Sequence, residues 1–247
     1  MRTTARGGRT VTSSSTQQVQ ALSLPEQLVL LAVDPDRGRI SGSPMVYVAM
    51  AGGVVLDLVD GGVATVQDGE VRVERPTTAT ALPGMLQQNA VAAVCTDEPR
   101  GVTHWVCQLA APRFRLGQQV AAALARRGVL RVERARRFGI FPVQRQRLLD
   151  RQAREELCAT ARLALVGAAQ PALRVRELLV LAGAAGLVDR LADPPQRTAA
   201  RQRIDRLTSQ GPVIGAVGQA VAEVQAEVRA ARRRVAVAAA IGGTHGG

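Results

Sequence analysis

The hydrophobic segments of this chain contain almost no aromatic side chains, which restricts the kind of core that the protein can build. Hydrophobic residues make up 47% of the sequence and aromatic residues only 2%, so Leu, Val and Ala must fill the interior. Such side chains pack well along helix faces without large rings. The 247 residues are enough for a sizeable core. We therefore expect a globular, mainly α protein.

The clearest helix start lies in residues 22–33. Ser23 is placed to cap the helix, Pro25 falls in its first turn, and Glu26 completes the spacing of a capping box. The helix should stop at residues 34–38, where Asp-Pro-Asp-Arg-Gly is a turn signature. The sequence thus predicts a short helix with defined ends.

The segment from Met45 to Val59 is apolar and rich in small residues, which predicts a buried helix. Its Gly52 and Gly53 lower helix propensity but admit a close neighbour. A polar loop is expected over 96–102. Further helices are predicted over 84–93, 104–127 with an interruption near Pro112, 145–166, 172–191, 195–207 and 212–240.

Two β-hairpins are predicted between the helices. Asp68-Gly69, flanked by alternating residues, is a strong signal for the first. Gly128 is suited to end the preceding helix, and an extended stretch begins at Val129. Residues 136–142 then form the second predicted hairpin, which carries two of the three Phe residues.

The charge is uneven along the chain. All 32 basic residues are Arg, and against 20 acidic residues they leave a net charge of +12, which favours anionic partners. An excess of +7 is concentrated in 25 residues, where Glu133 is the sole acidic side chain. The eight basic residues of this segment are Arg113, Arg115, Arg126, Arg127, Arg131, Arg134, Arg136 and Arg137.

The reactive side chains form no catalytic or metal-binding pattern. Cys95, Cys107 and Cys158 are odd in number and lack CxxC spacing, which argues against a disulfide framework and a zinc site. His104 and His245 give no metal-ligand spacing, and no phosphate-binding glycine loop is present. We therefore expect no catalytic residue, metal or cofactor, and a reduced, cytoplasmic setting.

The two ends of the chain are polar or rich in glycine. Residues 1–20 are Arg, Thr, Ser and Gln without an apolar segment, which predicts a disordered basic tail rather than a signal peptide. Residues 242–247 predict a flexible Gly-rich tail. The longest apolar runs, such as Leu178 to Val188, are shorter than the roughly 18 residues that span a bilayer. Membrane contact should therefore be peripheral.

Six short motifs are spread in order from about Leu22 to Val228. They are Leu22-Ser-Leu-Pro-Glu-Gln-Leu-Val-Leu-Leu, Gly52-Gly-Val-Val-Leu-Asp-Leu58 with its following Gly-Gly turn, Trp105-Val, Arg127-Gly-Val-Leu130, Arg137-Phe-Gly-Ile-Phe-Pro142 and Arg176-Glu-Leu-Leu-Val-Leu-Ala-Gly-Ala-Ala-Gly-Leu187. In this order and spacing they resemble the Golgi phosphoprotein 3 family. The resemblance is to a bacterial, and specifically an actinobacterial, member of that family. The resemblance defines residues 21–241 as the family's helical domain.

The resemblance implies a single helical-bundle domain with short β-hairpins, one of them exposed and able to dip into a membrane. Eukaryotic relatives bind phosphatidylinositol 4-phosphate in a basic pocket beside that hairpin and act as adaptors that retain glycosyltransferases. In this sequence Gly42 and Ala51 stand where that pocket has a Trp and an Arg, and a further Arg pair falls near Phe114 and Gly117.

We therefore expect a peripheral membrane adaptor that binds anionic, phosphoinositide-type phospholipid and a protein cargo. Arg side chains near the surface attract lipid headgroups, and inserted apolar side chains add burial. The candidate membrane-inserting residues are Phe138, Ile140 and Phe141. The candidate headgroup-binding residues are Arg113, Arg115, Arg134, Arg136 and Arg137.

The same residues also allow other interpretations. In one alternative, the Phe side chains of the hairpin fold into the core instead of facing a membrane. In another, Arg113 and Arg115 cap a helix or pair with carboxylates instead of binding a phosphate. The high charge also suits a nucleic-acid-binding regulatory protein, although no helix-turn-helix or aromatic stacking surface is recognisable. A protein-only scaffold is a third reading. Insertion of the hairpin into a neighbouring copy would give a homo-oligomer.

Overall fold

The computed structural model of the chain describes residues 19, 21–38, 40, 44–73, 85–94, 99–137, 141–167 and 169–242. The mainly α class is confirmed. The helices are α2 (Leu24–Ala32), α3 (Met45–Asp60), α4 (Met85–Val94), α5 (Val102–Ala110), α6 (Leu116–Arg126), α7 (Arg151–Val166), α8 (Leu173–Ala184), α9 (Val188–Leu191), α10 (Arg197–Ser209) and α11 (Pro212–Gly242), with 3-10 turns η1 (Pro112–Phe114) and η2 (Pro194–Gln196). The strands are β1 (Ala64–Gln67), β2 (Glu70–Val73), β3 (Arg100–Gly101), β4 (Leu130–Arg137) and β5 (Phe141–Leu148).

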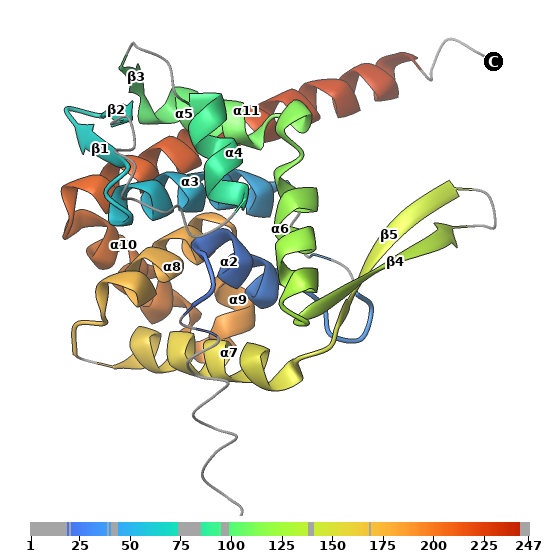
Figure 1. The fold of residues 1–247 in the computed structure, drawn as a ribbon, viewed down its shortest axis with the longest axis horizontal. Helices are drawn as coiled ribbons and strands as arrows, with labels where there is room; N and C mark the ends of the chain where they lie inside the picture. The colour runs from blue at the N-terminus through green and yellow to red at the C-terminus, as the bar shows by residue number, and fades with distance from the viewer. Residues whose placement is uncertain are drawn as a thin grey trace, which may run out of the picture.

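Helix α3 lies in the middle of the bundle, in contact with α2, α5, α8 and α11 (Figure 1). A Cβ added to Gly52 would lie 2.5 Å from Val221 and 3.1 Å from Val217, both on α11. A Cβ on Gly53 would lie 3.1 Å from Leu24 of α2. The prediction that these glycines admit close neighbours is confirmed, and they set how near α11 and α2 can approach.

The predicted capping box at the start of α2 is present. The Ser23 hydroxyl accepts a hydrogen bond from the Glu26 backbone N–H at 3.4 Å, and the Ser23 N–H donates to the Glu26 carboxylate at 2.8 Å. Pro25 occupies the first turn as expected. This reciprocal pair satisfies the backbone N–H donors of Ser23 and Glu26, which would otherwise lack a partner at the helix start.

The first hairpin is confirmed and extended by a third strand. Asp68 and Gly69 take φ values of 51° and 76° between β1 and β2, the geometry that a two-residue hairpin turn needs. The polar loop expected over 96–102 is wrong in its last part, because Arg100–Gly101 is β3 and pairs with β2, and Val102 begins α5. A two-residue edge strand gives no alternation that a sequence pattern can reveal.

The second hairpin is much longer than residues 136–142. Strands β4 and β5 pair antiparallel from Leu130 opposite Leu148 to Arg137 opposite Phe141, and they project from the body of the bundle (Figure 1). The helix expected to begin at Arg145 is therefore wrong: α7 begins at Arg151. Asp150 caps it by accepting a hydrogen bond from Ala153 N–H at 2.9 Å.

The remaining helices follow the predictions with changes at their ends. Gly128 takes φ 71° after α6, as expected of a helix end. The helix expected over 172–191 is broken, because Gly186 takes φ 72° and separates α8 from α9. Pro194–Gln196 forms η2 before α10. The predicted tails fall mostly outside the described residues, although Val19 is buried in the core cluster.

Candidate functional site

The base of the β4–β5 hairpin carries a surplus of exposed positive charge. Arg131 lies directly opposite Arg147, and Glu133 lies opposite Arg145; all three arginines are exposed. The ion pair from Arg147 Nη1 to Glu133 Oε1 is long, at 3.9 Å. Like charges directly opposite each other weaken a strand pair. The Arg131–Arg147 pair therefore does not serve the stability of the hairpin, and it suits an anionic partner.

The outer half of the hairpin holds the other predicted site residues. The backbones of Arg134, Arg136 and Arg137 lie in β4, where they pair with Gln144, Pro142 and Phe141 of β5. This places three arginine positions along one strand next to the hairpin tip. The predicted insertion residues Phe138 and Ile140 lie outside the described residues.

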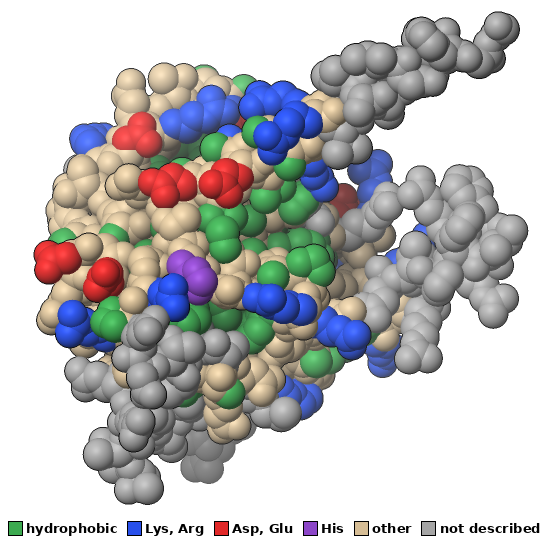
Figure 2. Space-filling model, turned by 90° about the horizontal axis from the view of Figure 1, so that it is seen from above, with side chains coloured by type: hydrophobic (Ala, Val, Ile, Leu, Met, Phe, Trp, Pro, Cys, Tyr) green, Lys and Arg blue, Asp and Glu red, His purple; other side chains and the backbone are tan. Residues whose placement is uncertain are grey.

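A cavity of about 670 Å³ lies beside the base of the hairpin, and we call it the hairpin cavity. Figure 2 shows this face, where a hollowed apolar area is flanked by Arg side chains. Most of its lining is apolar, which suits an apolar or amphipathic ligand. It is lined by Pro44, Tyr47, Val48, Cys107, Ala110, Ala111, Pro112, Arg115, Leu116, Gly117, Gln118, Gln146, Val224, Glu227 and Val228.

The predicted pair Arg113 and Arg115 is split by the structure. Arg115 lines the hairpin cavity from the turn before α6, where it takes the left-handed conformation with φ 52°. Its carbonyl accepts hydrogen bonds from Gln118 and Gln119 N–H, at 2.9 and 3.1 Å. Arg113 is exposed on η1 and does not line the cavity. One guanidinium, not two, therefore faces this space from that loop.

The sequence reasoning missed two residues of the cavity, Tyr47 and Glu227. The Glu227 carboxylate supplies a negative charge opposite in sign to Arg115, and after burial it is the second cause that raises the pKa of the Cys107 thiol. Cys107 therefore stays a thiol and not a thiolate at neutral pH. Because Arg115 and Glu227 carry opposite charges, the lining of the hairpin cavity has no net charge.

Two of the positions that the resemblance aligns with a basic pocket, Gly117 and Ala51, lie within the described residues. A Cβ on Gly117 would lie 2.5 Å from the Tyr47 ring, so any larger side chain at this position would have to displace that ring. Ala51 is fully buried and does not line the cavity. Gly42 lies outside the described residues. A glycine inside a helical pattern, as at Gly117, was the one sequence signal for this close approach.

These features define a mainly helical protein with a projecting, Arg-bearing hairpin beside an apolar cavity. A comparison with protein families matches residues 24–224 to Golgi phosphoprotein 3 (GPP34). Because this match spans most of the chain, the protein belongs to the Golgi phosphoprotein 3 family. A search of curated proteins found no match. None of the helices, over the residues described, combines the length and apolar character needed to cross a membrane.

Proposed function

We propose that the protein is a peripheral membrane adaptor that binds anionic phospholipid through the β4–β5 hairpin. The observation that carries this proposal is the projecting hairpin with Arg131 set opposite Arg147 and with Arg145 beside them. Each arginine near an anionic surface contributes about 1 kcal/mol of attraction. The surface potential of the membrane also relieves the repulsion between the paired arginines.

The apolar part of the attachment comes from the tip. Phe138, Ile140 and Phe141 insert into the acyl boundary, and burial of each such side chain contributes about 1.5–3 kcal/mol. Arg134, Arg136 and Arg137 then lie at headgroup level. A combination of insertion and electrostatic attraction is the usual requirement for stable but reversible attachment.

The hairpin cavity is the candidate site for a lipid headgroup. Arg115 on its rim, with Arg113 nearby in sequence, attracts a phosphate, and the apolar lining accepts part of a chain. Because Tyr47 fills the space over Gly117, this site does not use the arginine set of the eukaryotic relatives, and we expect weak selectivity among phosphoinositides and other anionic headgroups.

The family is associated with phosphoinositide binding and adaptor roles, and it is an adaptor-type family without catalysis. By the same reasoning this protein acts in the cytoplasm, holds an as yet unidentified protein cargo at the membrane, and needs no cofactor. The unit that does this is residues 21–241. Insertion of the hairpin into a second copy would provide a homo-oligomer away from the membrane.

The charge argument is tested by vesicle co-sedimentation of an Arg131→Gln, Arg147→Gln variant. We expect its binding to phosphatidylcholine vesicles containing phosphatidylserine to fall about thirtyfold, since two arginines contribute about 2 kcal/mol less attraction. The matched control is Arg162→Gln, Arg206→Gln on α7 and α10, which removes the same charge away from the hairpin. Equal loss in both variants would contradict the proposal, because it would show a response to net charge alone.

A further inference from the structure

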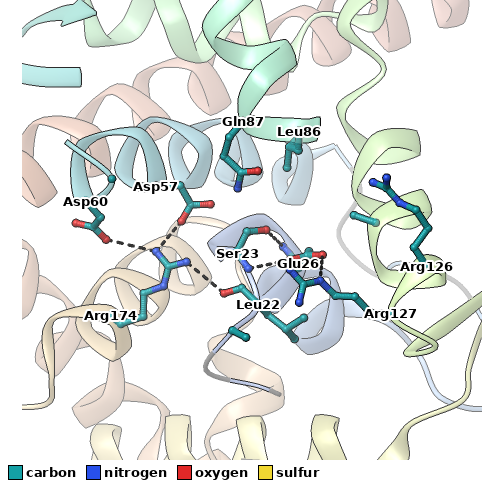
Figure 3. Close-up of a pocket in the computed structure, with 13 residues that line it drawn as sticks. Leu22, Ser23, Glu26, Asp57, Asp60, Leu86, Gln87, Arg126, Arg127 and Arg174 are labelled. Carbon is teal, nitrogen blue, oxygen red and sulfur yellow. Dashed lines mark hydrogen bonds and ion pairs between the residues drawn. The ribbon is translucent and has the colours of Figure 1, made fainter. Parts of the chain in front are cut away.

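A second cavity, of about 630 Å³, lies at the ends of α3 and α6 that are opposite to the hairpin cavity. The starts of α3 and α6 line the hairpin cavity, whereas the last turns of these two helices line the second one. The start of α2, the side of α4 and the first turn of α8 complete it (Figure 3). We call this space the charged cavity, since its walls carry carboxylates and guanidinium groups.

One wall of the charged cavity is acidic. Asp57 is buried on α3 and accepts an ion pair from Arg174 Nη1 at 2.6 Å, and Asp60 lies 3.4 Å from the same nitrogen. Behind them Glu177, also buried, lies 3.9 Å from it. One guanidinium therefore serves three carboxylates. Asp57 also accepts the Leu24 backbone N–H, at 3.2 and 3.3 Å from its two oxygens. Because one guanidinium cannot balance both Asp57 and Asp60, this wall favours an additional cation.

The protonation of the buried carboxylates follows from this shortage of positive charge. Burial raises the pKa of Asp57 to about 6, although Arg174 opposes the shift. Burial, and then the neighbouring Asp60 carboxylate, raise the pKa of Glu177 to about 8. At neutral pH Glu177 is thus mostly protonated, while Asp57 and Asp60 still face the cavity with a single arginine between them.

The facing wall is basic. Arg126 and Arg127 come from the last turn of α6 and its C-cap and line the cavity. Arg127 Nε lies 3.2 Å from Glu26 Oε1, while the other Glu26 oxygen accepts the Ser23 N–H in the capping box. The terminal nitrogens of Arg127 are not used by that ion pair, and its side chain is 38% exposed. An anionic group at this wall therefore has guanidinium donors available.

Gln87 lies between the two walls and has no evident structural role. It is 7% exposed on α4, and its amide points into the cavity (Figure 3). Within the described part of the chain this amide has no hydrogen-bond partner. Neither amide atom is among the fully buried side-chain atoms that lack a partner. The amide therefore faces the open cavity, where its donor and acceptor are available to a ligand.

We propose that the charged cavity binds a small zwitterion, with an ammonium at Asp57 and Asp60, a carboxylate at Arg127, and the Gln87 amide bonded to the ligand between them. The ion pairs Arg174–Asp57 and Arg127–Glu26 also stabilise the fold, but neither explains the unpartnered amide or the open space. The volume lies within the range of small-molecule sites. This ligand site is independent of the membrane-binding function proposed above.

The test is titration calorimetry of the full chain with glycine, 4-aminobutyrate and 6-aminohexanoate, which place the ammonium and carboxylate at increasing separation. Hexylamine and hexanoate, each with one of the two charges, are the controls. We expect one of the zwitterions to bind at least about tenfold more tightly than either control, because it satisfies both walls. The best chain length then reports the spacing of the walls.

Two variants locate the binding. Gln87→Leu should weaken the best zwitterion at least about tenfold, whereas Gln88→Leu, on the exposed side of the same helix, should not. Circular dichroism confirms that both variants fold. The proposal is overturned if none of the zwitterions binds below about 10 mM, if hexylamine or hexanoate binds equally well, or if Gln87→Leu has no effect.

Discussion

At the scale of single residues, Gly52 shows how tightly α3 and α11 are packed. A methyl group at this position would lie 2.5 Å from Val221 Cγ2, and a valine side chain has little freedom to move aside. We expect Gly52→Ala to lower the free energy of unfolding by about 1–3 kcal/mol, measured by urea denaturation. Gly101→Ala is the control, since a Cβ there meets only Gly69 O at 3.8 Å. Equal stability of the two variants would contradict this packing.

Glu177 should make stability fall as the pH rises. Because its pKa in the fold is raised to about 8 from an ordinary 4.5, the native state holds a proton that the unfolded chain releases, and stability is lost as pH rises through 8. Between pH 6.5 and 8.5 we expect wild type to lose on the order of 2 kcal/mol relative to Glu177→Gln. Denaturation curves across this range measure it. Parallel pH profiles would show that Glu177 is already ionised in the fold.

At the scale of elements, the β4–β5 hairpin should be separable from the fold. Its base is anchored by buried Leu130 and Leu148 and by the hydrogen bond from Gln146 N–H to Gly38 O at 2.9 Å. The outer residues project away from the body (Figure 1). Replacing residues 134–144 by Asn-Gly joins the partners Glu133 and Arg145 through a favoured turn.

We expect this shortened protein to keep its melting temperature within about 3 °C and to lose binding to anionic vesicles. Thermal unfolding measures the melting temperature, and co-sedimentation measures the binding to vesicles. A protein that no longer folds would show that the outer hairpin belongs to the core. Full vesicle binding after the deletion would place the membrane contact elsewhere.

The elements that the sequence predicted best were those with local signals. Ser23 and Glu26 act three residues apart, and Asp68-Gly69 adopts its turn through its own backbone preferences. Residues 145–148 were mistaken for helix because they are mostly polar and their strand pairs with 130–133, a contact that local periodicity cannot show. Tyr47 and Glu227 were missed for the same reason, since α3 and α11 meet at the hairpin cavity only in the folded chain.

At the scale of the whole molecule, the net charge of +12 predicts attraction to any anionic polymer or surface but does not choose among them. What distinguishes a membrane from nucleic acid is the requirement for apolar insertion at the hairpin tip. Phosphate attraction alone gives binding that falls steeply with salt. Inserted side chains give a component that salt does not remove.

The most direct measurement is co-sedimentation of wild type and a Phe138→Ala, Phe141→Ala variant with neutral, anionic and phosphoinositide-containing liposomes. We expect wild type to bind both kinds of anionic liposome and not the neutral ones, and the variant to lose most of that binding because about 3–6 kcal/mol of insertion is removed. Binding by neither protein, or equal binding by both, would contradict a hairpin-anchored membrane adaptor.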